Sequence, residues 1–209
     1  TTQPSYDNST AKQQAAETNG TNWYGYVENE AGTKNSCDIF IKVDTIAPTC
    51  QVNITSGTPG KNGWYTSNVA LKLNRIEDNG SPIKGYGLSQ GTTKNKYNST
   101  TTGTQSDSTA SGTTWYGYVK DEAGNEGSCK TARAIKVDTT TPTCSIAARG
   151  TEGKNGWYKS DVTLTLDAQA KGASGISYDL TKSTTPTYNG NKQITQSSET
   201  TGTEIYGYV

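Results

Sequence analysis

A repeat with a spacing of about 93 residues constrains the fold of this chain more than any other feature of its sequence. The pentapeptide WYGYV occupies residues 23–27 and returns at 115–119, and the related IYGYV occupies 205–209. Solenoid repeats have units of roughly 20–50 residues, whereas a β-sandwich domain has ~100 residues. The spacing therefore predicts tandem domains rather than the coils of one solenoid.

Two connectors set the expected domain boundaries. Residues 43–49 (VDTIAPT) and 137–143 (VDTTTPT) lack glycine and contain a proline, which favours an extended and fairly stiff linker. We therefore expect the C-terminal half of a domain at 1–43, a complete domain at 44–137, and a domain without its last strand at 138–209. We call these segments the first, middle and third copies.

The two incomplete copies allow two interpretations. In one, the chain is a window cut from a longer array, because it lacks an initiator methionine and a signal peptide. In the other, the incomplete ends complete each other between chains by strand donation. Residues 1–27 and 183–209 repeat the same segment, so these ends overlap rather than complement each other. We favour the first interpretation.

Alternating apolar residues predict that the chain is all-β. In residues 39–43, 69–73 and 162–166 an apolar side chain occupies every second position, which is typical of a strand with one buried face. Only residues 11–17 look helix-like, and that segment is too short to be stable alone. A sandwich of about seven short antiparallel strands follows for the middle copy. The expected strands are 49–55, 68–74, 84–89, 93–97, 101–106, 114–120 and 129–137.

One face of each of these strands should be buried. Gly117 falls on this inward face, and we expect a large ring such as Trp64 to fill the space above it. The inward set expected for the middle copy is Cys50, Val52, Ile54, Trp64, Val69, Leu71, Leu73, Tyr86, Leu88, Trp115, Val119, Ile135 and Val137.

The spacing of the four cysteines favours one pairing. An extended strand and a connector separate Cys37 from Cys50 and Cys129 from Cys144. Six strand residues span ~20 Å, whereas a disulfide needs Cα atoms ~4.4–6.8 Å apart. Cys50 opens the first expected strand of the middle copy and Cys129 opens the last, and these starts share one pole in an immunoglobulin-type sandwich. We predict a Cys50–Cys129 disulfide, with Cys37 and Cys144 unpaired or paired outside the chain. Four free thiols in a reducing compartment are the alternative.

Several motifs together resemble a known family. The motif PTC at 48–50 and 142–144, GWYxSxVxLxL at 156–166 and YGYVKDEAGN at 116–125 are similar to the bacterial immunoglobulin-like repeats. This resemblance covers essentially the whole chain. It implies tandem immunoglobulin-like β-sandwiches of about seven antiparallel strands each, in a surface or adhesin-type protein, and no catalytic residues. The first copy departs from the pattern, with NEAGT at 29–33.

Recurrent tyrosines form a possible ligand face. Tyr116 and Tyr118 alternate with inward residues and should lie on the outer face of their sheet, as should Tyr24 and Tyr26 in the first copy. Exposed tyrosines can stack on sugar rings or contact a protein. Cross-strand aromatic pairing that stabilises a thinly packed sheet is the alternative, and we favour it.

Three aspartates are weak calcium candidates. Asp121 begins the DEAGN segment, which could bind a hard cation but more often forms a tight turn with Gly124 at positive φ. Asp44 and Asp138 lie in the connectors and could bind calcium together with loop carboxylates, although a solvated linker charge is the simpler interpretation. We therefore predict neither a metal nor another cofactor.

Composition excludes several classes of function. Lys and Arg number 19 and Asp and Glu number 19, so the formal net charge is 0, and histidine is absent. A neutral chain lacks the positive electrostatic potential that attracts nucleic acids and anionic membranes. Without histidine, the commonest general base of enzymes is missing. No run of 18 apolar residues is present, so no membrane insertion is expected. We expect that the chain is not an enzyme.

The preferred interpretation is an extracellular, cell-surface structural segment whose partners are adjacent immunoglobulin-like domains of the same chain. Stiff connectors would align the domains, and the disulfide would resist pulling. The alternatives are an adhesin module that binds a glycan or host protein, and a component of a phage or appendage filament.

Overall fold

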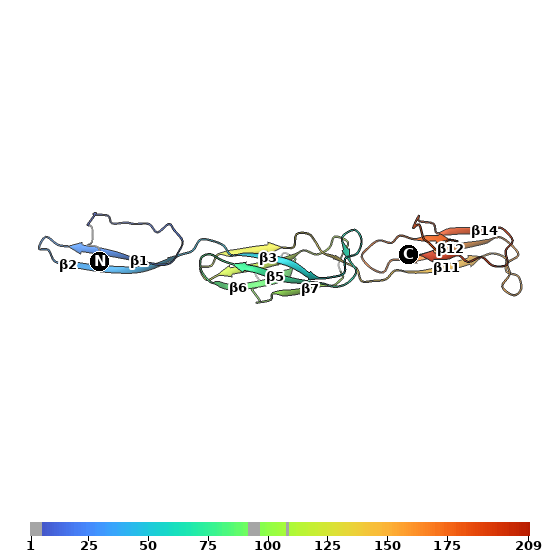
Figure 1. The fold of residues 1–209 in the computed structure, drawn as a ribbon, viewed down its shortest axis with the longest axis horizontal. Coiled ribbons are helices and arrows are strands. Elements are labelled where there is room, and N and C mark those ends of the chain that lie inside the picture. The colour runs from blue at the N-terminus through green and yellow to red at the C-terminus, as the bar shows by residue number, and fades with distance from the viewer. Residues whose placement is uncertain (1–5, 92–96, 108) are drawn as a thin grey trace. The chain divides into compact units, whose positions relative to one another are not determined.

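A computed structural model describes residues 6–91, 97–107 and 109–209 of the chain. These residues form strands β1–β15 and no helix, so the prediction of an all-β chain is confirmed (Figure 1). No membrane-spanning helix is found among the described residues. The helix-like segment at 11–17 contains no helix.

The chain divides into two compact units, each built from several segments. Unit 1 comprises residues 1–55, 71–103 and 114–133, and unit 2 comprises residues 56–70, 104–113 and 134–209. The boundaries expected at 43/44 and 137/138 stay a prediction.

Unit 1 contains an antiparallel hairpin and a three-stranded antiparallel sheet. The hairpin pairs β1 (Thr18–Glu28) with β2 (Lys34–Val43), and Gly25 lies opposite Cys37. In the sheet, β8 (Trp115–Asp121) is central between β6 (Ile83–Gln90) and β9 (Glu126–Lys130). Gly117 lies opposite Cys129 in this sheet, which is the register that Gly25 and Cys37 have in the hairpin.

Unit 2 contains two small sheets and a parallel strand pair. One sheet has the order β11–β12–β14, and the other pairs β13 with β15 in antiparallel fashion. The strand β4 pairs with β10 in parallel. Their bounds are β4 (Trp64–Tyr65), β10 (Lys136–Val137), β11 (Thr143–Arg149), β12 (Val162–Gln169), β13 (Asp179–Thr181), β14 (Gln193–Gln196) and β15 (Tyr206–Tyr208). Most residues of a further sheet belong to unit 1. Its order is β3–β5–β7, with bounds Thr49–Ser56, Val69–Glu77 and Thr102–Gln105.

Each unit has its own small apolar core. In unit 1 the buried apolar residues are Val52, Leu71, Leu73, Leu88, Trp115, Tyr118 and Val119, and in unit 2 they are Val69, Ile135, Val137, Leu166 and Leu180. Strand alternation therefore predicts most of the inward positions of the middle copy correctly, because the pleat fixes which face a side chain takes.

Several expected positions of the middle copy differ in the structure. Ile54 was expected inside but is 40% exposed, since it lies near the end of an edge strand. Cys50, Trp64 and Tyr86 are only half-buried. Alternation assigns a side chain to a face but does not reveal how far that face is covered.

The last expected strand of the middle copy, 129–137, is also wrong as a single element. A non-strand segment at 131–134 separates β9 from β10, and the two strands pair with different partners. Cys129 consequently lies within β9 and does not open the last strand. The expected strand 93–97 falls mostly on residues 92–96, which lie outside the described residues, and Tyr97 is not in a strand.

Candidate functional site

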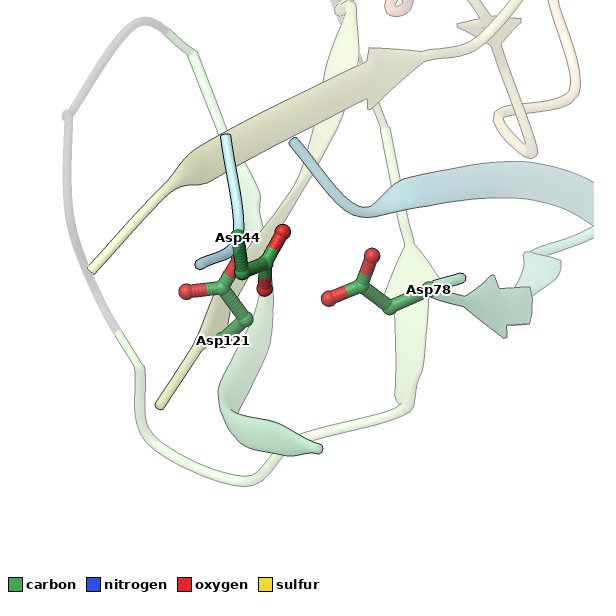
Figure 2. A group of neighbouring side chains, drawn as sticks. All are labelled: Asp44, Asp78 and Asp121. Carbon is green, nitrogen blue, oxygen red and sulfur yellow. The ribbon is translucent and has the colours of Figure 1, made fainter. Parts of the chain in front are cut away.

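An acidic cluster in unit 1 brings together three residues that are far apart in the sequence. Asp44 lies in the connector after β2, Asp78 follows β5, and Asp121 is the last residue of β8. One carboxylate oxygen from each lies within 4.8 Å of the other two. Figure 2 shows the Asp78 carboxylate directed toward the other two carboxylates. The cluster therefore joins the connector to two strand ends.

Asp121 organises the turn that follows it. Its side chain is fully buried, and Oδ1 accepts hydrogen bonds from the backbone N–H groups of Gly124 (2.6 Å) and Asn125 (2.8 Å). Asn125 Nδ2 donates to Asp121 Oδ2 and to the carbonyl oxygen of Asp44. Gly124 has a φ of 104°, a conformation that glycine adopts without strain. The turn expected for DEAGN is thus built around this carboxylate.

Asp44 is held by neighbouring backbone groups. The N–H of Ser81 donates to Oδ2 at 2.6 Å, and the N–H of Ile46 donates to Oδ1 at 3.1 Å. Hydrogen bonds from the side chain and backbone of Ser81 are the main cause of a pKa below the ordinary value of 3.8. Gly80 lies so close that a Cβ on it would overlap the Asp44 carboxyl group. A glycine is required there for this approach.

Asp78 is the member of the cluster that sequence reasoning missed. Its Oδ1 accepts a hydrogen bond from the N–H of Gly80 at 3.3 Å. Its Oδ2 is buried and has no hydrogen-bond partner among the described residues. The sequence D-N-G at 78–80 signals a turn, but only the approach of the strand ends places this carboxylate beside Asp44.

The cluster has the chemistry of a hard-cation site. Carboxylate and carbonyl oxygens are the ligands that Ca²⁺ prefers, although Ca²⁺ takes six to eight of them. None of the ion pairs among the described residues involves these three carboxylates. Negative charges this close, with one of them buried, repel each other unless a cation or protons compensate them.

Asp138 occupies the place of Asp44 in the third copy but joins no such cluster among the described residues. Its Oδ2 accepts hydrogen bonds from the N–H (2.8 Å) and Oγ (2.5 Å) of Ser174, which lower the pKa of this carboxyl below 3.8. Gly172 approaches it as Gly80 approaches Asp44. However, Ala170 precedes Gly172 by two residues, where the middle copy has Asp78.

Cys50 and Cys129 form a disulfide in unit 1, with a Cα–Cα distance of 5.6 Å across 79 residues of sequence separation. Gly117 faces this bridge, since a Cβ there would overlap Leu73 Cδ1 and lie 2.6 Å from Cys129 Sγ. The residues that fill the space above Gly117 are thus Leu73 and the disulfide, and the expectation of Trp64 is wrong. Cys37 and Cys144 are free and exposed.

The tyrosine pairs are placed differently in the first and middle copies. Tyr24 and Tyr26 are 57% and 46% exposed, and their rings stack at 6.3 Å. Tyr116 and Tyr118 also stack, at 6.4 Å, but Tyr118 is buried, which raises the pKa of its phenol. The expectation that Tyr118 is exposed is wrong: its side chain is buried, and it lies on the central strand of its sheet, between β6 and β9.

Comparison with known proteins gives one partial similarity. No family model and no solved structure matches the chain. Exoglucanase B of Cellulomonas fimi is 30% identical over 160 residues, which cover 73% of this chain and 14% of that protein. The similarity therefore concerns a small part of the exoglucanase.

Proposed function

We propose that this chain is an extracellular structural segment, made of tandem immunoglobulin-like β-sandwiches of the bacterial surface-protein type, and that it carries out no catalysis. Its role is that of a spacer between functional parts of a larger protein. The repeated WYGYV and PTC motifs support this proposal, because one sandwich repeated along a chain is a poor host for a single active site.

The disulfide is the observation that carries the proposal. Disulfides persist in oxidising environments outside the cell, and small domains with little apolar core depend on them. The middle copy has few buried apolar side chains for its length, and only 30% of the whole chain is hydrophobic. A covalent bond between β3 and β9 would therefore hold this copy together under load.

The similarity to an exoglucanase adds support for an accessory role. The matched segment covers 73% of this chain but only 14% of the exoglucanase. A segment of this size fits a domain that positions a functional part better than it fits the functional part itself.

Single-molecule force spectroscopy tests the spacer function. With the disulfide intact, pulling on the chain ends cannot extend the 79-residue separation between Cys50 and Cys129. Reduction should add about 270 Å of extensible chain, at ~3.4 Å per residue. The same contour length released before and after reduction would contradict a mechanical role for the middle copy. Extension without any force peak would contradict it as well.

A binding module is a second candidate, favoured by the exposed pair Tyr24 and Tyr26. Stacked, exposed aromatic rings provide a surface for sugar rings or a protein partner. A glycan array with the parent chain and the variant Tyr24→Ala measures this directly. Binding that is lost in the variant would support the candidate, and equal signals for both proteins would remove this face from consideration.

A further inference from the structure

Both connectors begin with the same dipeptide, Asp-Thr, at residues 44–45 and 138–139. In each connector the two side chains bond to different copies of the repeat. The threonine bonds to the copy that precedes the connector, and the aspartate bonds to the copy that follows it. The contacts of the first connector lie within unit 1, and those of the second lie within unit 2. The dipeptide therefore ties each connector on both sides.

The threonine of each dipeptide donates two groups to one carboxylate. In the first connector the N–H and the hydroxyl of Thr45 donate to the Glu17 carboxylate. In the second connector the N–H of Thr139 and its Oγ1 donate to Asp107 Oδ1, at 3.1 Å and 2.9 Å. Bonds from both the backbone and the side chain of one residue to a charged group fix the direction in which the connector leaves the preceding copy.

The two acidic residues reach their threonines from positions that are not equivalent in the repeat. Glu17 lies six residues before Trp23, whereas Asp107 lies eight residues before Trp115. The two tryptophans begin the same WYGYV motif, so both the spacing and the type of the acidic residue differ. Because the same contact forms from different residues, it belongs to the joint and is not a by-product of the repeated motif.

The aspartate of the second connector is seated against a glycine of the third copy. Asp138 Oδ2 accepts hydrogen bonds from the N–H and the Oγ of Ser174, and Oδ1 accepts one from the N–H of Thr140 at 3.0 Å. A Cβ on Gly172 would lie 2.0 Å from Asp138 Oδ1, so the carboxylate fills the place that a side chain there would need. Asp44 is held in the same way against the middle copy, by the contacts described above.

Asp138 joins the middle copy to the third copy through a single residue. Its N–H donates to the carbonyl oxygen of Tyr65 at 3.0 Å, directly after the pairing of β10 with β4, whereas its carboxylate bonds to Ser174. Asp138 is half-buried, whereas Thr139 and Asp107 are exposed. A hydrogen bond away from water is electrostatically stronger than an exposed one. The aspartate should therefore contribute more to the joint than the threonine.

We propose that the Asp-Thr dipeptide is a two-sided clasp that restricts rotation between consecutive copies, with the aspartate carboxylate as its main element. The proline of each connector fixes only its own φ and restricts the residue before it, so it leaves the chain free to turn at the dipeptide. The clasp bonds the dipeptide to both copies. This inference deepens the proposed spacer function and rests on it, because a spacer transmits position only if its joints resist bending.

Gly172→Ala tests the clasp with one methyl group. The methyl group would overlap the Asp138 carboxyl group and should displace it from Ser174. The φ of Gly172 lies outside the left-handed region, so alanine adds no backbone strain there. Gly175→Ala is the matched control, because it adds the same methyl group to the same loop, where a Cβ meets no atom within 4 Å. Only the first substitution should loosen the joint.

Amide nitrogen relaxation, measured by NMR on the full chain, reports how each copy rotates in solution. The amides of β5, β8 and β10 represent the middle copy, and those of β11 and β12 represent the third copy. In the parent chain and in Gly175→Ala, one rotational diffusion tensor should describe both sets of amides. In Gly172→Ala two tensors should be needed. The rotational correlation time of the third copy should then fall by about a third or more, because this copy reorients by itself.

Three further substitutions separate the two halves of the clasp. Asp138→Ala removes the carboxylate without adding an atom to the third copy, and it should have the effect of Gly172→Ala. Asp107→Ala removes the acceptor of Thr139 in the middle copy, and it should have a smaller effect because that contact is exposed. Thr141→Ala is the control for both, since it truncates an exposed threonine of the same connector.

Two tensors in the parent chain, or a single tensor in both Gly172→Ala and Asp138→Ala, would overturn the clasp. An effect of Asp107→Ala no larger than that of Thr141→Ala would overturn its two-sided form. Hydrogen exchange in β12 controls for folding of the third copy, and if Gly172→Ala unfolds this copy, Asp138→Ala is the deciding variant. Failure of the clasp is distinguishable from failure of the spacer function, because reduction of the disulfide releases the same length of chain whether or not the joint is fixed.

Discussion

Removal of the Cys50–Cys129 disulfide should weaken the middle copy far more than the third copy. The bridge closes a loop with a sequence separation of 79 residues. In the chain-entropy model a loop of this length stabilises the folded state by about 4.5 kcal/mol at 25 °C. Single domains have a free energy of unfolding of about 5–15 kcal/mol, so the loss is about 30% of the total or more.

Hydrogen exchange measured by mass spectrometry can follow this loss in each part of the chain. The variant is Cys50→Ala with Cys129→Ala, made in a background without Cys37 and Cys144 so that no other disulfide forms. Protection of the peptide that covers β8 should fall by about a thousandfold or more, because each 1.4 kcal/mol is a factor of ten. The peptide that covers β12 provides the internal control, since the third copy contains no bridge.

Two results would refute this reasoning. A loss below about 1 kcal/mol in β8 would mean that the unfolded chain is not constrained by the bridge as the entropy model assumes. An equal loss of exchange protection in β8 and β12 would mean that the middle and third copies unfold together, so that the disulfide does not stabilise the middle copy alone.

Three further predictions concern the glycine beside the bridge and the acidic cluster. Gly117→Ala should destabilise the middle copy by about 1–3 kcal/mol in urea unfolding, because the added methyl group overpacks against Leu73 and the disulfide. Gly175→Ala is the control, since a Cβ there meets no atom within 4 Å, and it should change the free energy of unfolding by less than ~0.5 kcal/mol. Acid should destabilise the protein below about pH 4. The pKa of Asp44 is lower in the folded state than its value of 3.8 in the unfolded state, so the ionised carboxylate stabilises the fold at a pH above 3.8. This stabilisation is lost as the pH falls through the folded-state pKa. Asp44→Asn should flatten this part of the pH dependence of the melting midpoint, and an unchanged slope would exclude Asp44 as its source. Calcium at ~10 mM should raise the free energy of unfolding by about 1–3 kcal/mol over a chelator control, for a Kd of ~10⁻⁴–10⁻³ M. Asp78→Asn should abolish the calcium effect, and equal midpoints in calcium and chelator would show that the cluster holds no such ion.

Much of the strand content could be predicted from the sequence because strand formation leaves a local signal. The period of two over residues 69–73 places Val69, Leu71 and Leu73 on one face, and all three are buried. Period alone could not divide residues 129–137 into β9 and β10. That division depends on pairing, since β9 bonds to β8 whereas β10 bonds to β4.

The candidate site could be predicted only in part. Asp44 and Asp121 attract notice because each lies in a motif that recurs, and the turn after Asp121 follows from the glycine at position 124. Asp78 has no counterpart in the third copy, where Ala170 occupies its place, so repetition gives no reason to select it. Only the packing of strand ends shows that its buried oxygen belongs beside the other two carboxylates.

The sequence by itself determined the repeat, the all-β character and the equivalence of Cys37 with Cys129 and of Cys144 with Cys50, because these depend on composition and spacing along one chain. The tertiary structure alone decided that Tyr118 is buried, that Ile54 is exposed and that three distant carboxylates meet. The physical reason is that burial and proximity are set by which strands become neighbours. Neighbouring strands come together through long loops, and no local pattern in the sequence records their pairing.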